Sequence, residues 1–102
     1  MGRIRIASIH EIPEGTGREV PVGRMTVAVW NVGGRFYATG PRCPHEDAPL
    51  SAGVLEGTVV TCPMHGWQFD VSTGQGVNPP HYRLRPFPVH VEGEDLYLDL
   101  GG

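Results

Sequence analysis

Two short loops of the chain each pair a cysteine with a histidine. In "CPHEDAPLSAG" one residue separates Cys43 from His45. In "CPMHGWQFD" two residues separate Cys62 from His65, and sixteen residues lie between the two pairs. Because the members of a pair are so close in sequence, each loop has to present a thiolate and an imidazole toward one point. Zinc sites and some iron–sulfur clusters use these donors, so the spacing predicts a metal site.

The donor set leaves three kinds of site open. Two cysteines in a small secreted domain could form a disulfide, although the histidine beside each cysteine counts against this. Structural zinc usually takes both cysteines from one knuckle and both histidines from another element, whereas each loop here contributes one of each. If the loops are related by a pseudo-twofold, the thiolates lie on one side and the imidazoles on the other, which suits two sulfide-bridged metal ions.

The segment before the first loop has the two-residue apolar period of β-strands. In "RIRIA" the period places Ile4 and Ile6 on one face and the arginines on the other. The two faces of "MTVAVWNV" would carry Met25, Val27 and Val29 on one side and Ala28, Trp30 and Val32 on the other. Gly33-Gly34 then precedes "RFYAT", and two glycines suit a tight hairpin turn because both can take positive φ. The sequence therefore predicts a hairpin here.

The C-terminal part predicts a second hairpin. Phe87, Val89 and Val91 alternate with Pro88, His90 and Glu92, and after "GED" come Leu96, Leu98 and Leu100 alternating with Tyr97 and Asp99. No stretch keeps a helical period for three turns, so an all-β, antiparallel sandwich or small barrel is expected. Residues 1–102 should form one domain. Residues of about 40–80, rich in Pro, Gly, Cys and His with short strands at "TVVT" and "WQFDV", would be a small insertion that carries the chemistry.

Composition excludes several classes of function. The formal charge is −3, and the eight basic residues, all arginine, are scattered along the chain, so no nucleic-acid partner is expected. A membrane-spanning helix or a signal peptide needs an apolar run, of about 18 residues in the case of a helix, and none is present. We therefore expect a cytoplasmic protein with no membrane partner.

The two loops resemble the cluster loops of Rieske [2Fe–2S] proteins, whose pattern is CxH followed by CxxH. The similarity continues beyond these four positions, at Ala48, Leu50, Ser51, Gly53, Gly66, Trp67, Phe69, Asp70, Thr73 and Gly74. "VNPP" resembles the proline loop that covers the cluster in this family, and "FPVHVEGEDLYLDL" resembles its closing hairpin. The resemblance covers most of the chain. It implies a Rieske-like antiparallel β sandwich or barrel base with a small cluster-binding insertion, and one [2Fe–2S] cluster per chain.

The resemblance also implies which residues bind which iron. Cys43 and Cys62 would bind one iron, and His45 and His65 would bind the other through a ring nitrogen. Two ferric ions, two sulfides and two thiolates sum to zero charge, whereas four thiolates would give −2. Adding an electron to a neutral cluster costs less, and Rieske centres accordingly lie at roughly −150 to +300 mV against about −400 mV for plant-type ferredoxins.

The chain departs from the high-potential respiratory members of the family. Those proteins carry an extra cysteine in each loop, forming a disulfide, and a serine and a tyrosine that donate hydrogen bonds to sulfur. The corresponding positions here hold Ala48, Met64, Trp67 and Phe69, none of which is a comparable donor. We therefore expect a potential near the low end, about −150 mV, as in the ferredoxins of bacterial aromatic-ring dioxygenase systems that this chain resembles.

The function implied is that of a one-electron carrier rather than an enzyme. A terminal oxygenase needs a second, mononuclear iron held by two histidines and a carboxylate, and the remaining chain is too short for that domain. The expected partners are a flavin-dependent ferredoxin reductase, which reduces the cluster, and a terminal oxygenase component, which oxidises it. The alternatives are a small Rieske subunit of a nitrite reductase or another redox enzyme, and a zinc-bound structural module.

Overall fold

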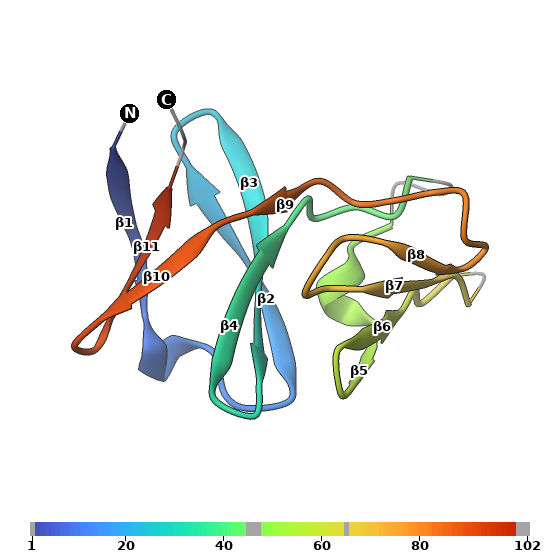
Figure 1. Cartoon of the computed structure of the whole chain (residues 1–102), viewed down its shortest axis with the longest axis horizontal. Coiled ribbons are helices and arrows are strands. Elements are labelled where there is room, and N and C mark those ends of the chain that lie inside the picture. Colours follow the sequence, from blue (N-terminus) through green and yellow to red (C-terminus); the bar gives the residue numbers. More distant parts are fainter. Residues whose placement is uncertain (1, 45–47, 65, 100–102) are drawn as a thin grey trace.

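The computed structural model describes residues 2–44, 48–64 and 66–99, and it consists almost entirely of β-strands (Figure 1). The elements are β1 (Arg3–Ser8), η1 (Ile9–Glu11), β2 (Thr16–Val22), β3 (Met25–Val32), β4 (Arg35–Thr39), η2 (Leu50–Ala52), β5 (Val54–Glu56), β6 (Val59–Thr61), β7 (Gln68–Asp70), β8 (Gly76–Asn78), β9 (Pro86–Phe87), β10 (Val89–Glu92) and β11 (Asp95–Asp99). The only helices in the described ranges are the two short 3-10 turns, and neither could span a membrane. The predicted all-β class is confirmed.

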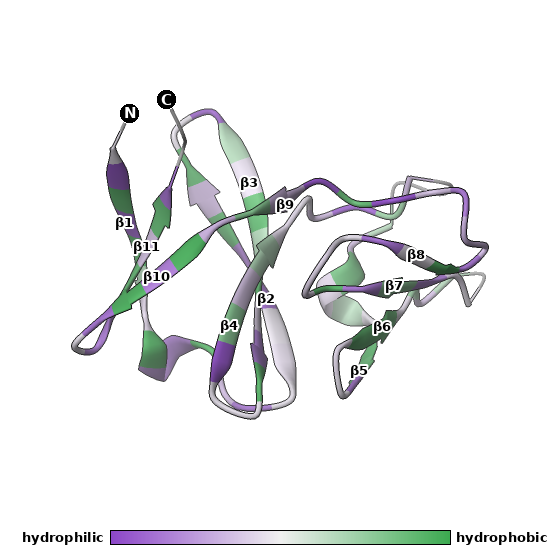
Figure 2. Ribbon diagram, viewed as in Figure 1, coloured by the Kyte–Doolittle hydropathy of each residue, from purple (hydrophilic) through white to green (hydrophobic). Residues whose placement is uncertain are grey.

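Three antiparallel sheets make up the molecule. Their strand orders are β1-β11-β10, β2-β3-β4-β9 and β5-β6-β7-β8. The first two sheets lie together on the left of Figure 1, and the third lies at the opposite end. The predicted strands at "TVVT" and "WQFDV" are β6 and β7 of this third sheet. Figure 2 shows apolar and polar stretches alternating along the strands, as the two-residue period requires.

The third sheet interrupts the second one in sequence. β4 and β9 flank it along the chain, and they pair with each other through Ala38 with Phe87 and Thr39 with Pro86. The amide of Gly40 also donates to the carbonyl of Arg85 at 2.9 Å. The chain therefore leaves the second sheet after β4 and returns to the same place before β9.

Strand β3 separates two hydrophobic cores. The base core consists of Ala7, Ile12, Val20, Val22, Val27, Val29, Ala38, Leu96 and Leu98. The site core consists of Ala28, Trp30, Cys43, Ala48, Leu50, Val60, Cys62, Phe69, Val71 and Leu84. Val27 and Val29 of β3 belong to the first, whereas Ala28 and Trp30 belong to the second. The predicted alternation of β3 is confirmed, and because both of its faces are buried, β3 joins the base to the third sheet.

Both predicted hairpins are present. The β3–β4 turn is closed by Val32 opposite Arg35, and Gly33 and Gly34 have φ values of 59° and 93°. The C-terminal hairpin pairs β10 with β11, and Leu96 and Leu98 are fully buried, as the pattern predicts. Leu100 lies outside the described residues. The run from Phe87 onward is divided, because Phe87 belongs to β9 and pairs with β4, and β10 starts only after Pro88.

Two apolar side chains predicted to face inward are exposed. Ile4 is 39% exposed near the start of β1, although it lies opposite the buried Leu98. A register shift between Arg5 and Ala7 changes the phase of β1 after Ile4 and turns Ala7 into the base core. Val91 is 51% exposed on β10, which is an edge strand of its sheet and is paired on one side only. The simple two-residue period is therefore wrong at these two positions.

Strand β2 is not evident from the sequence. Its residues, "TGREVPV", include a glycine, a proline and two charges, which are unusual in strands. Pro21 is tolerated because β2 is an edge strand, where a missing N–H leaves no ladder bond unmade. Gly17 is required by packing, since a Cβ there would lie 2.2 Å from Cε3 of Trp30. The strand thus completes the cover of Trp30.

Candidate metal centre

The first loop places Cys43 at the buried end of a doubled-back segment. Cys43 follows β4 closely, and its amide donates to the carbonyl of Ala48 at 2.9 Å. The amide of Leu50 donates to the carbonyl of Pro41 at 3.0 Å, which brings the two arms of the segment together. The Cys43 side chain is 1% exposed. The backbone bonds of this loop therefore hold a thiol inside the site core.

The second loop presents Cys62 in the same way. Cys62 comes directly after β6, and its amide donates to the carbonyl of Trp67 at 2.6 Å. The amide of Gly66 donates back to the carbonyl of Cys62 at 3.3 Å, and Gly66 has a φ of 76°, which favours glycine. Cys62 is 3% exposed. The loop is thus a tight reversal between β6 and β7 with its thiol turned inward.

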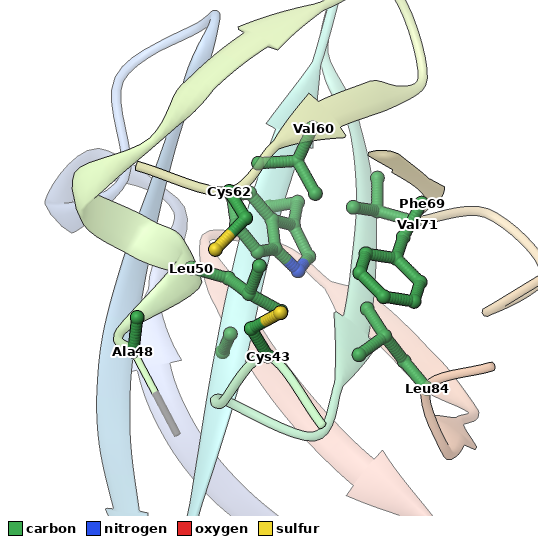
Figure 3. Packing of buried hydrophobic residues seen from close by; sticks show 10 residues of the cluster. Cys43, Ala48, Leu50, Val60, Cys62, Phe69, Val71 and Leu84 are labelled. Atoms are coloured by element: carbon green, nitrogen blue, oxygen red, sulfur yellow. The ribbon is translucent and has the colours of Figure 1, made fainter. Parts of the chain in front are cut away.

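The two thiols come together in one core. Cys43 and Cys62 both belong to the site core, and Figure 3 shows their side chains beside Leu50 among the other buried residues. Neither cysteine is part of a disulfide, so the disulfide alternative is wrong. Two buried thiols from two separate loops fit the thiolate half of a sulfide-bridged iron pair, because soft thiolates select iron–sulfur and related metal centres.

The described side chains that form the site core around the thiols are largely apolar. Phe69 is fully buried and Ala48 is 6% exposed, and neither carries an O–H group that could donate to sulfur. Trp67 is partly buried and packs against the site core. The indole N–H of Trp30 is directed elsewhere, donating to the hydroxyl of Thr39 at 3.0 Å. These surroundings agree with a potential near the low end of the Rieske range.

The two predicted imidazole ligands lie outside the described residues. His45 and His65 are therefore not placed, and their role as ligands stays a prediction. Their described neighbours Pro44, Met64 and Gly66 are exposed, in contrast to the buried cysteines.

A third segment, residues 77–82, contacts the second loop, and the sequence pattern did not predict this contact. The ring of Tyr82 lies against that of Trp67, with centroids 4.7 Å apart and planes inclined at 42°. Asn78 pairs with Gln68, the first residue of β7. Residues 77–82, called the proline segment below, therefore run alongside the residues that close the second loop. Only the "VNPP" similarity pointed toward this segment, and it indicated neither Tyr82 nor Gln75 as a contact residue.

The proline segment folds back over the first residue of β8, and this close approach requires a glycine there. A Cβ on Gly76 would lie 2.1 Å from the carbonyl oxygen of Tyr82 and 2.5 Å from that of Pro79. We expect Gly76→Ala to lower the free energy of unfolding by about 1–3 kcal/mol, because backbone atoms cannot move aside as a side chain would. Gly40→Ala is the control, since the nearest atom to its Cβ is 4.0 Å away. Equal urea midpoints for the two variants would contradict the packing described here.

The comparison with protein families decides between the metal sites left open. The family model described as "Rieske [2Fe-2S] domain" matches residues 2–88. The chain belongs to the Rieske family. The Rieske chain therefore carries one [2Fe–2S] cluster rather than a structural zinc ion, and the two buried thiols match the sulfur donors that such a cluster needs.

Curated relatives and solved structures extend this similarity over the whole Rieske chain. It is 39% identical, over 98% of its length and 95% of the relative's, to the 3-phenylpropionate/cinnamic acid dioxygenase ferredoxin subunit of Escherichia coli strain K12. It matches the ferredoxin of carbazole 1,9a-dioxygenase from Nocardioides aromaticivorans IC177 with a TM-score of 0.88, 28% identity and coverage of 96% and 97% of the two chains. These relatives are ferredoxins, so the Rieske chain is an electron-transfer component and not an enzyme in its own right.

A third similarity comes from a solved assembly. The chain matches a component of the complex of reduced oxygenase and oxidised ferredoxin in carbazole 1,9a-dioxygenase, with a TM-score of 0.84 and 38% identity. The match covers 94% of this chain and 91% of that component. In that system a ferredoxin is thus seen together with its oxygenase.

Proposed function

We propose that this Rieske chain is the ferredoxin of a multicomponent aromatic-ring dioxygenase. It accepts one electron from a flavin-dependent reductase and passes it to a terminal oxygenase. The observation that carries the proposal is the meeting of two buried cysteines, neither of them in a disulfide, from the CxH and CxxH loops in one site core. The relatives named as dioxygenase ferredoxin subunits support the choice of system, and the ferredoxin–oxygenase complex supports the choice of electron acceptor.

The proposed ligands are the four residues of the two motifs. Cys43 and Cys62 hold one iron, and His45 and His65 hold the other. When bound, the cluster supplies a site that takes up and releases a single electron. The chain's own contribution is to keep water from the thiolates by burying both cysteines against Leu50 and Phe69, and to fix both loops by backbone hydrogen bonds.

We propose a single Rieske domain over residues 1–102, with a cluster-binding part of about 40–80 inserted into a β base. The pairing of β4 with β9 supports this division, because the inserted segment leaves and re-enters the base between adjacent strands. The third sheet, β5–β8, comes wholly from the inserted segment. Two cysteines that form no disulfide fit a reducing compartment, and this supports a cytoplasmic location.

Reconstituted electron transfer tests the proposed function. The purified, oxidised protein is mixed without oxygen with NADH and a catalytic amount of a flavin reductase from an aromatic-ring dioxygenase system, and then with the oxidised terminal oxygenase. We expect the visible absorption of the cluster to bleach with the reductase and to recover on adding the oxygenase. The proposal would be overturned if the reduced cluster were not reoxidised by the oxygenase but delivered its electron to a nitrite reductase. That result would favour the small-subunit alternative.

A further inference from the structure

We infer that Gln75 is a positioning residue that holds the proline segment, residues 77–82, against the second cysteine loop. The inference deepens the proposed function, since it concerns how the chain shields the cluster that Cys62 is proposed to bind. It rests on the hydrogen bonds of a single exposed amide and on what those bonds connect.

The backbone of Gln75 is fixed in the turn between β7 and β8. Its carbonyl accepts from the amide of Asp70 at 2.8 Å, and its amide donates to the hydroxyl of Thr73 at 3.1 Å. Asp70 in turn accepts from the amide and the hydroxyl of Ser72 at 2.9 and 2.6 Å. The turn is therefore well bonded without the Gln75 side chain, which is left to make contacts elsewhere.

The Gln75 side chain reaches across to the proline segment. Nε2 donates to the carbonyl of Pro80 at 2.8 Å, and Oε1 accepts from Nη2 of Arg83 at 3.3 Å. Because a guanidinium group can only donate, Arg83 sets the orientation of the amide and directs its N–H₂ group toward Pro80. The isolated bridge between Gln75 and Arg83 brings their backbones together as well.

The middle of the proline segment has no backbone donor of its own. Pro79 and Pro80 have no N–H groups, so neither can donate a ladder hydrogen bond to β8 or to a neighbouring loop. The Gln75 side chain supplies a donor from outside the segment, and the carbonyl of Pro80 accepts it. Gly76 allows the approach, since the carbonyls of Pro79 and Tyr82 occupy the space that a Cβ there would take.

The contact continues from the proline segment to the cysteine loop. The ring of Tyr82 packs on Trp67 at 4.7 Å, and the carbonyl of Trp67 accepts from the amide of Cys62 at 2.6 Å. A proline segment released from Gln75 would therefore loosen its packing on the residue that closes the Cys62 loop. We expect the result to be greater access of water and chelators to the metal centre.

Gln75→Leu tests this role, with Gln68→Leu as the matched control. The backbone of Gln68 pairs with Asn78, but its side chain does not hold the segment, because Nε2 donates to the hydroxyl of Thr61 at 3.3 Å. Gln68→Leu therefore removes a side-chain bond of the same sheet and leaves the Gln75–Pro80 bond in place. Gln75→Leu removes the side-chain bonds to Pro80 and Arg83, and loss of the one to Pro80 alone should open the segment about two- to tenfold more often. We expect Gln75→Leu to lose its cluster to an iron chelator faster by that factor. Its reduction potential should rise, because water stabilises the extra negative charge of the reduced cluster. Gln68→Leu should match the wild type in both measurements.

Gln75→Glu separates the hydrogen bond from the shape of the side chain. The carboxylate keeps the length of the side chain and can still accept from Arg83, but it cannot donate to Pro80. We expect chelation at least as fast as in Gln75→Leu, whereas Gln68→Glu, which adds the same charge nearby, should remain like the wild type. Wild-type chelation rates in both Gln75 variants, with an unchanged potential in Gln75→Leu, would overturn the inference.

Amide hydrogen exchange at Leu84 separates this inference from the proposed function. Its N–H lies just after the proline segment and donates to the carbonyl of Gly74 at 2.7 Å, and its exchange is measured on the same samples. Faster exchange in Gln75→Leu than in the wild type supports the positioning role whatever metal the protein holds. A wild-type protein without acid-labile sulfide would end the proposed function but leave this readout intact. If the wild-type protein holds its cluster but exchange is equally fast in the wild type and in Gln75→Leu, the inference fails and the proposed function stands.

Discussion

Replacing Cys62 by alanine should leave the purified protein without its [2Fe–2S] cluster. The thiol is 3% exposed and lies in the site core with Cys43, so no other sulfur donor of the chain could take its place. Alanine removes only the sulfur from the buried side chain, and the far-ultraviolet circular dichroism should therefore still show a β-sheet protein. Iron and sulfide content should both fall to near zero, and the visible absorption should disappear.

Met64→Ala is the control for this prediction. Met64 lies in the same loop, carries the only other sulfur there and is 61% exposed, so its removal should leave cluster content unchanged. A Cys62→Ala protein that keeps a full complement of iron and sulfide would show that Cys62 is not a ligand. It would also remove the main support for the proposed arrangement of the metal centre.

Replacing His65 by cysteine should lower the reduction potential, provided that the variant retains its cluster. The proposed imidazole ligand is neutral, whereas a thiolate brings one negative charge to the cluster and makes reduction less favourable. The difference between Rieske centres and plant-type ferredoxins with four thiolates sets the scale, and we expect a fall of about 100 mV or more. Redox titration followed by visible circular dichroism would measure it.

His10→Cys is the matched control for the added cysteine. His10 is exposed on η1, and its ring lies 2.9 Å from Glu94, in the base and not in the site core. This exchange should leave the potential at the wild-type value. A rise in the potential of His65→Cys, or an equal change in both variants, would contradict the charge argument.

Much of the base could be predicted because local chemistry decides it. The alternation of Val27 and Val29 with Ala28 and Trp30 predicts β3 whatever lies on either side, and Gly33-Gly34 specifies its turn. What the alternation cannot show is that two different cores meet at β3. That arrangement depends on sheets brought together from distant parts of the chain.

The errors in the base have identifiable physical causes. The register shift that turns Ala7 into the base core depends on how β1 pairs with β11, about ninety residues away in sequence, so no local pattern reveals it. β2 contains Pro21 and Gly17, which argue against a strand until the edge position and the ring of Trp30 are known. In both cases a long-range contact overrides the local preference.

In the metal centre too, some features follow from the local sequence and others depend on tertiary contacts. The Cys and His spacings indicate the chemistry, and the structure brings Cys43 and Cys62 into one site core as they predict. Gln75 has no comparable signal, because an exposed glutamine in a turn is ordinary until its amide is seen to reach Pro80. Hydrogen bonds from a side chain to a distant carbonyl depend on tertiary structure, and spacing alone does not encode them.

Metal and sulfide analysis of the purified protein, combined with electron paramagnetic resonance, tests the central claim most directly. We predict two irons and two acid-labile sulfides per chain, no zinc, and a rhombic low-g signal after reduction by one electron, as mixed cysteine and histidine ligation requires. One zinc ion per chain without labile sulfide would contradict the claim.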